Sequence, residues 1–190
     1  MRSNPERRAA LVDAAIEVLA ELGARGLTFR AVDSRAGVPP GTASNYFANR
    51  DDLLAQAGGR FYERLTPDDE SLAQSLGGPH DRDHLVGLMR EVVGRITEFR
   101  TGFLALLELR LEATRRPELR AVLTERIRAD LDFNVTNHLQ AGMPGDATTV
   151  RLLYLALNWL IVDRLTLPEL FSDSEIDELI EAAVDRALSG

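Results

Sequence analysis

Residues 41–46, with the sequence GTASNY, combine side chains that are small or polar. A helix with such a flat, hydrogen-bonding surface can enter the major groove of DNA, which is about 12 Å wide. The stretch follows Gly37, and a glycine here allows two short helices to meet at a steep angle. The pattern predicts a helix-turn-helix, with a supporting helix over residues 28–36 and a reading helix over residues 40–46. A packing corner of a helical bundle is the alternative.

Residues that could hold a metal or perform catalysis are few. Asp81, Asp83 and His84 lie close together in the sequence, but Asp81 and His84 stand where a helix should begin, so capping explains them. The paired Glu-x-x-His motifs of di-iron bundles, phosphate-binding glycine loops and the G-x-S-x-G motif are all absent. With three His and no Cys, the chain is poorly suited to bind zinc. We therefore expect no enzyme, no cofactor and no metal.

Helices must position these residues, because apolar side chains recur with the 3.6-residue period of a helix along almost the whole chain. Ser3 with Glu6 and Ser172 with Glu175 have capping-box spacing, and Asn49 is the expected N-cap of a fourth helix. A linker is expected over residues 66–81, which are rich in Pro, Gly and Asp. The expected fold class is all-α with about nine helices: four short ones before the linker and five longer ones over residues 83–99, 102–115, 117–140, 146–165 and 173–188.

Charge is distributed unevenly along the chain. The 22 basic residues are all Arg, and 30 acidic residues give a formal net charge of -8. Residues 1–60 hold 8 Arg against 7 acids, a net charge of +1, whereas residues 61–190 have a net charge of -9. The acidity therefore argues against indiscriminate DNA binding but not against DNA binding by the N-terminal part. The longest uncharged apolar run has 11 residues, and a membrane span needs about 20, so we expect a cytoplasmic location and no membrane partner.

Residues 9–54 resemble the N-terminal DNA-binding domain of the TetR family of transcriptional regulators. The similarity covers about a quarter of the chain, and its spacing and residue types match over some 45 positions. The matching features are an Ala-rich first helix with Gly23, followed by Leu27-Thr28, Ala36-Gly37-Val38, Gly41-Thr42, Tyr46-Phe47, Arg50 and Leu53-Leu54. The resemblance implies an N-terminal three-helix helix-turn-helix domain over residues 1–50. A helical effector-binding and dimerisation domain is implied over residues 51–190.

The resemblance also implies a set of DNA contacts. Thr28 and Arg50 are expected to bind phosphates, and Arg30 a phosphate or a base edge. Asn45 has the amide geometry that suits adenine, and Tyr46 is expected to contact the backbone or a thymine methyl group. The full set of expected DNA-binding residues is Thr28, Arg30, Gly41, Thr42, Ser44, Asn45, Tyr46 and Arg50.

Two residues depart from the family pattern. Asp33 stands where the family usually has a small residue, and Ser44 where it commonly has an aromatic one. A carboxylate at position 33 must find a partner, in Arg30 or in backbone N–H groups of the turn, or else tilt toward solvent. Both departures affect how bases are read rather than the fold.

The C-terminal part is expected to form a homodimer and to enclose an effector. Packing within the monomer alone is the alternative for the apolar stripes of its last two helices. The expected dimer residues are Leu153, Leu157, Leu160, Ile161, Ile176, Leu179, Ile180 and Ala183. The expected pocket for a small, largely apolar effector takes apolar residues and polar anchors from the middle helices: Met89, Phe99, Phe103, Leu107, Arg110, Asn134, His138, Asn158 and Trp159.

The function expected from the sequence is that of a regulator, more specifically a repressor. It would bind a palindromic double-stranded operator as a homodimer and be released by the effector. The alternative is a helical interaction protein whose helix-turn-helix no longer binds DNA. Asp33 and the small positive charge of residues 1–60 are the observations in favour of that alternative.

Overall fold

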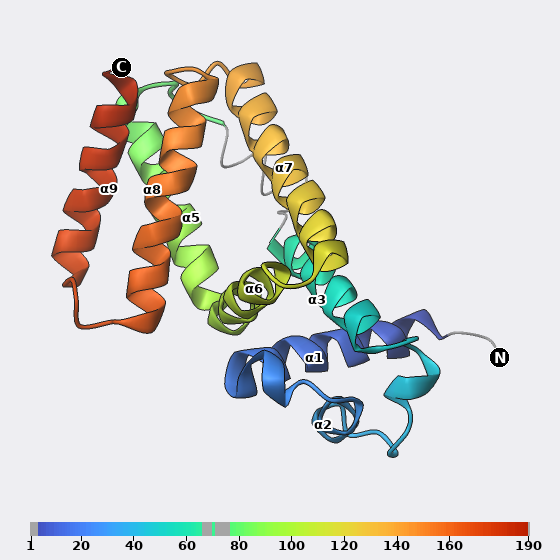
Figure 1. Cartoon of the computed structure of the whole chain (residues 1–190). Helices are drawn as coiled ribbons and strands as arrows, with labels where there is room; N and C mark the ends of the chain where they lie inside the picture. Colours follow the sequence, from blue (N-terminus) through green and yellow to red (C-terminus); the bar gives the residue numbers. More distant parts are fainter. Residues whose placement is uncertain (1–3, 66–69, 71–76, 190) are drawn as a thin grey trace. The chain divides into compact units, whose positions relative to one another are not determined.

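The computed structural model describes residues 4–65, 70 and 77–189. These residues form eight α-helices and one 3-10 helix and contain no strand, which confirms the all-α fold class predicted from the sequence (Figure 1). Most of the predicted linker lies outside the described residues. None of the described helices is long and apolar enough to cross a membrane.

The chain divides into two compact units that are discontinuous in sequence. One comprises Met1–Thr66 with Arg100–Ile127, and the other Pro67–Phe99 with Arg128–Gly190. This division differs from the boundary predicted at residue 50, because elements from the middle of the chain fold together with the helix-turn-helix.

The first unit is built around its first helix, which packs against three others. Its elements are α1 (Pro5–Gly26), α2 (Phe29–Arg35), η1 (Ala43–Asn45), α3 (Arg50–Leu65), α6 (Arg100–Ala113) and the first part of α7 (Pro117–Gln140). α1 begins after Asn4, whose side chain accepts the backbone N–H of Arg7 at 3.1 Å. The predicted Ser3–Glu6 capping box falls on Ser3, which lies outside the described residues; Asn4 caps the helix, with Pro5 in the first turn.

α1 is interrupted near its C-terminal end. Gly23 has φ 66° and ψ 179°, and helical structure resumes as far as Gly26. Only glycine adopts this backbone conformation readily, since a Cβ atom would clash there. Beyond the bend, the Ala24 N–H donates to Glu108 at 2.9 Å and the Leu27 carbonyl accepts from Arg50 at 3.0 Å, so this end of α1 bonds to other elements of the unit.

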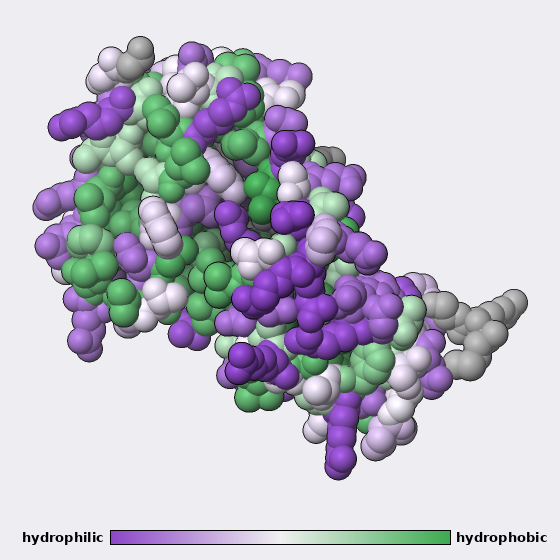
Figure 2. All heavy atoms as spheres, viewed as in Figure 1, coloured by the Kyte–Doolittle hydropathy of each residue, from purple (hydrophilic) through white to green (hydrophobic). Residues whose placement is uncertain are grey.

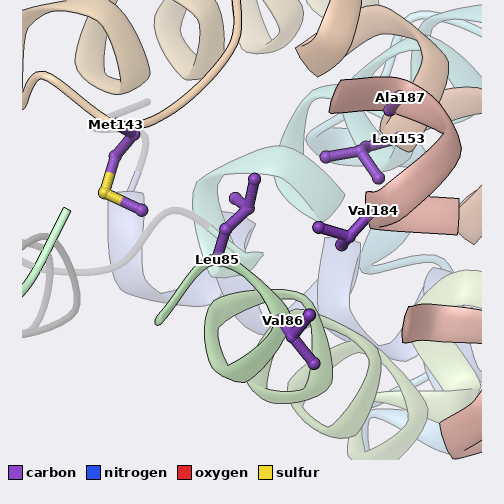
Figure 3. Packing of buried hydrophobic residues seen from close by; sticks show 6 residues of the cluster. All are labelled: Leu85, Val86, Met143, Leu153, Val184 and Ala187. Carbon is purple, nitrogen blue, oxygen red and sulfur yellow. The ribbon is translucent and has the colours of Figure 1, made fainter. Parts of the chain in front are cut away.

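The second unit packs α5 (Arg82–Glu98), α8 (Ala147–Thr166) and α9 (Asp173–Leu188) against one another, and it also includes the last part of α7. Its core is an apolar cluster drawn from these helices and from the α7–α8 turn: Leu85, Val86, Met143, Leu153, Val184 and Ala187 (Figure 3). Ion pairs join the exposed edges of α5 and α9, with Arg82 on Asp185 at 2.8 Å and Arg90 on Glu181 at 2.5 Å.

The predicted helix starts are largely confirmed. The Ser172–Glu175 capping box is present at α9, and Asp81 accepts the His84 backbone N–H at 2.9 Å at the start of α5. Asn49 accepts the N–H of Asp52 at 2.9 Å at the start of α3. Such caps can be predicted because both partners lie within one turn of the chain.

Candidate nucleic-acid interface

The turn between α2 and η1 has the geometry of a helix-turn-helix. Gly37 adopts φ 63°, and the N–H of Val38 donates to the Asp33 carbonyl at 3.0 Å. The second element is shorter than predicted. Instead of an α-helix over residues 40–46, the structure has the single 3-10 turn Ala43–Asn45, because Gly41 has φ 89° and a helix cannot run through it.

Asp33 lies inside this turn and is only 2% exposed. Its Oδ2 accepts the N–H of Gly41 and its Oδ1 accepts the N–H of Ala43, both at 2.7 Å. Of the outcomes open from the sequence, the structure shows the backbone N–H groups as its partners. The carboxylate therefore presents no charge on the outer surface, and both of its oxygens are satisfied.

The polar side chains of residues 41–46, which we call the reading segment, fold back on their own backbone. Ser44 Oγ and Asn45 Nδ2 both donate to the Gly41 carbonyl, at 2.8 and 3.0 Å, and Thr42 Oγ1 donates to the Pro39 carbonyl at 2.5 Å. Ser44 and Asn45 are exposed. Asn45 keeps its amide oxygen and one N–H free of these bonds, the acceptor and donor that an adenine edge requires.

Two of the expected phosphate-binding residues lie on the exposed surface of α2. Thr28 is its N-cap, and the hydroxyl oxygen accepts the Ala31 N–H at 3.1 Å, which leaves the hydroxyl hydrogen able to donate. Arg30 follows in the first turn of the helix and is also exposed. Both positions are compatible with a contact to the DNA backbone.

Arg50 is held differently from the others. Its Nε donates to the Leu27 carbonyl at 3.0 Å and its Nη2 to the Ala24 carbonyl. The side chain therefore ties the start of α3 to the end of α1. The phosphate contact expected for Arg50 stays a prediction. The guanidinium N–H groups that are not engaged in these two bonds would make it.

Arg8 has a place in the site that the sequence analysis did not assign. Its Nη2 donates to the Tyr46 carbonyl, its Nη1 donates to Gln56 Oε1 at 3.1 Å, and the guanidinium lies 5.2 Å from the centroid of the Phe47 ring. An Arg in the first turns of an amphipathic helix ordinarily indicates a solvated face. Nothing in the spacing between residues 8 and 46 predicts this contact.

α6 anchors the helix-turn-helix within the first unit. Glu108 Oε2 accepts the Ala24 N–H at 2.9 Å, just after the bend in α1. Further along α6, Glu112 bonds Arg116 at 2.8 Å and Arg115 at 2.7 Å; Arg116 and Arg115 together lower the pKa of Glu112 to about 2. Since Arg116 also pairs with Asp51 at the start of α3, α6 is linked to both flanking helices of the motif.

The residues predicted to form a dimer interface are mostly buried within their own unit. Leu153, Leu157, Leu160, Ile161, Ile176 and Ile180 are buried in the single chain, so a part for these six in a dimer interface stays a prediction. Leu179 is 41% exposed, and Ala183 is half-buried.

The exposed apolar face of α8 is formed by three other residues. These are Leu152, Leu155 and Trp159, which are 48%, 63% and 70% exposed. Figure 2 shows apolar side chains gathered over the surface where α8 and α9 lie.

The nine predicted effector residues are divided between the two units, with Phe103, Leu107 and Arg110 in the first and the other six in the second. Phe103 is buried and its ring lies 6.4 Å from that of Phe61. Met89 packs against the core cluster, and Trp159 lies on the exposed face of α8. The other residues named for the pocket stay predictions, among them Asn134 and Asn158, whose amides donate to carbonyls of their own helices.

His138 is buried near the end of α7, with its Nε2 3.0 Å from the Pro144 carbonyl oxygen. Burial lowers the pKa of His138 from 6.5. The folded protein therefore binds this proton less tightly than the unfolded chain. The contribution of neutral His138 to the free energy of unfolding is complete above about pH 6.5 and is lost as the pH falls from there toward the lowered pKa.

Between pH 7.5 and pH 5.5, the wild type should lose more free energy of unfolding than His138→Gln, as measured by urea denaturation at each pH. Equal losses in the two proteins would contradict the assignment.

The second element of this helix-turn-helix is exposed and polar, and a scaffold of helices holds it in place. This is the arrangement by which helix-turn-helix proteins bind DNA. Residues 11–57 match the family model described as "Bacterial regulatory proteins, tetR family". Residues 80–190 match the model described as "Tetracyclin repressor-like, C-terminal domain". The chain belongs to the TetR family, and it is a TetR-like DNA-binding transcriptional regulator.

Known proteins agree with this assignment. The chain is 31% identical over 143 residues to the HTH-type transcriptional regulator BetI of Rhizobium meliloti (strain 1021), covering 75% of this chain and 68% of BetI. It is 33% identical over 91 residues to the HTH-type transcriptional repressor KstR of Mycolicibacterium smegmatis, covering 47% of this chain and 45% of KstR. The solved structure of a TetR family member from Streptomyces coelicolor A3 superposes with a TM-score of 0.68 at 30% identity, covering 97% of this chain and 99% of that one.

Proposed function

We propose that the protein is a homodimeric repressor that binds a palindromic operator through α2 and the reading segment and is released by a small, largely apolar effector. The exposed Ser44 and Asn45 lie on a turn held by the buried Asp33 carboxylate, and this observation carries the DNA-binding part of the proposal. The cytoplasmic location expected from the sequence belongs to the same proposal.

The alternative of an interaction protein that no longer binds DNA loses its main support. It rested on Asp33 and on the small positive charge of residues 1–60. The Asp33 side chain is buried, and both of its oxygens accept backbone N–H groups. An interior carboxylate held in this way shapes the reading segment and does not stand between that segment and the phosphates.

Dimerisation is the second part of the proposal. Leu152, Leu155 and Trp159 are spaced i, i+3 and i+7, so they share one face of α8. Exposed apolar patches of this kind mark surfaces that bind a partner. Because a palindrome presents two equivalent half-sites, a second copy of the chain is the occupant that fits the proposed operator.

Selecting DNA from a random pool tests the proposal. We expect a palindrome whose half-sites are about 34–36 Å apart, or a multiple of that distance. Asn45→Ala should relax the preference at one base pair, at a loss of about 1–3 kcal/mol in discrimination. Arg30→Ala should weaken binding to all sequences and reduce the salt slope by about 1.

Arg128→Ala is the matched control, because this exposed Arg lies on α7 in the second unit and not on the proposed dimer face of α8. It should leave both the base preference and the salt slope unchanged. If no sequence is enriched at low salt, the proposed function is wrong and the interaction protein becomes the better description.

A further inference from the structure

The reading segment has few backbone hydrogen bonds. They join Thr42 N–H to the Pro39 carbonyl at 3.2 Å, Asn45 N–H to the Thr42 carbonyl at 3.0 Å, and the N–H groups of Tyr46 and Phe47 to the Ala43 carbonyl at 2.9 and 3.0 Å. A helical turn this short gains little stability from such bonds, because nucleation fixes several dihedral angles for each hydrogen bond gained. The conformation that DNA would meet therefore depends on other residues as well.

Two charged side chains are bonded to opposite ends of this segment. At its amino end, Asp33 accepts the N–H groups of Gly41 and Ala43, both at 2.7 Å. At its carboxyl end, Arg8 donates to the Tyr46 carbonyl. A negative charge at the amino end and a positive charge at the carboxyl end is the arrangement that the dipole of a helical turn favours, and both sets of bonds are charge-assisted.

Both side chains are themselves fixed in place. Asp33 is buried in α2, so water does not compete for its two bonds. Arg8 is partly buried, bonds Gln56 of α3 at 3.1 Å and lies over the Phe47 ring. Gln56 in turn donates to Asp52 Oδ1 at 2.6 Å, and Asp52 Oδ2 accepts the N–H of Ala48 at 3.0 Å. Elements α1, α2 and α3 thus hold the two ends of the segment through side chains.

We propose that Asp33 and Arg8 are specificity-determining positioning residues, which hold the reading segment in the conformation that distinguishes the operator from other DNA. The inference rests on the proposed function. It assigns specificity to two side chains that act through the backbone of the segment and need not touch a base.

The Asp33 experiment separates positioning from simple electrostatics. Removing a negative charge close to DNA should by itself strengthen binding to every sequence. The positioning role predicts the opposite for the selected operator, with Asp33→Ala weakening its binding about tenfold or more while binding to a scrambled duplex does not weaken. Asp33→Asn keeps one acceptor oxygen and should lose less. Thermal unfolding of each variant establishes that it is folded, and Asp33→Asn serves if Asp33→Ala does not fold.

The Arg8 experiment uses the salt dependence of binding. A phosphate contact by Arg8 would make Arg8→Gln weaken binding to all DNA and lower the salt slope by about 1. The positioning role predicts weaker binding to the operator with an unchanged slope, and a smaller loss for Arg8→Lys, which retains one donor for the Tyr46 carbonyl. Arg7→Ala calibrates the loss of one positive charge from the neighbouring exposed position.

The outcomes are distinct. If the wild type selects a sequence but the Asp33 and Arg8 variants change operator and scrambled affinities by the same factor, the inference is overturned and the proposed function stands. If the wild type selects no sequence, the inference and the proposed function are both wrong.

Discussion

Replacing Gly23 with alanine is expected to lower the free energy of unfolding by about 1–3 kcal/mol, because φ 66° with ψ 179° is a conformation that essentially only glycine adopts. The added Cβ would also lie 3.2 Å from Glu108 Oε2. That carboxylate bonds the N–H of Ala24, so Glu108 cannot move aside without giving up the bond. Urea denaturation monitored by circular dichroism measures the loss.

Gly94→Ala is the matched control for this prediction. Gly94 lies in the interior of α5 and is exposed, and a Cβ atom there would meet nothing within 4 Å. Alanine at such a helical position should raise the free energy of unfolding by about 0.4–1 kcal/mol. The two substitutions are chemically identical and should act in opposite directions. A Gly23→Ala protein as stable as the wild type would show that the bend in α1 does not require glycine.

Replacing Leu155 with arginine should convert the proposed dimer into a monomer. Leu155 is 63% exposed in the single chain and lies between Leu152 and Trp159 on one face of α8. In an interface formed by this face, the guanidinium would lose its water without gaining an anionic partner, which costs several kcal/mol. We therefore expect the dimer dissociation constant to rise about a hundredfold or more, since each 1.4 kcal/mol is a factor of ten. Sedimentation equilibrium measures it.

Leu111→Arg is the control for the effect of an added charge, because Leu111 is 60% exposed but lies on α6 in the first unit. It should leave the dimer intact. Loss of the dimer should also weaken operator binding, because two half-sites must be occupied together. A folded Leu155→Arg protein that keeps the mass of a dimer would place the interface elsewhere.

Local features of this fold could be predicted from the sequence because cause and effect lie within a few residues. Asn49 and Ser172 cap their helices as expected, and Gly37 takes the left-handed conformation that the turn needs. The reading helix was predicted too long, because the positive φ of Gly41 depends on the path of the whole turn. Its sequence, PPGTASNY, is equally compatible with a helix that begins at Pro40.

The long-range contacts could not be predicted. Arg50 bonds a carbonyl 26 residues away, and Glu108 bonds an N–H 84 residues away. Spacing contains no information about such partners. Which apolar residues of the last two helices face the core of their unit could not be predicted for a related reason. α8 has apolar residues on every side, so periodicity could not separate Leu153 and Leu157, which face the core of their own unit, from Leu155 and Trp159, which remain exposed.

The packing of α6 against α1 affects whether the DNA-binding part of this protein can be exchanged with that of a relative. Residues 1–50 look like an exchangeable module in the sequence, yet the apolar side of α1 is covered in part by residues 100–113, and its bend is secured by Glu108. A graft of residues 1–50 onto a relative would bring α1 without the surface that shapes it. The compact unit that contains α1 is discontinuous, with residues 1–66 together with 100–127. Changing the operator of such a regulator is therefore better attempted by substituting side chains on the reading segment than by exchanging its first 50 residues.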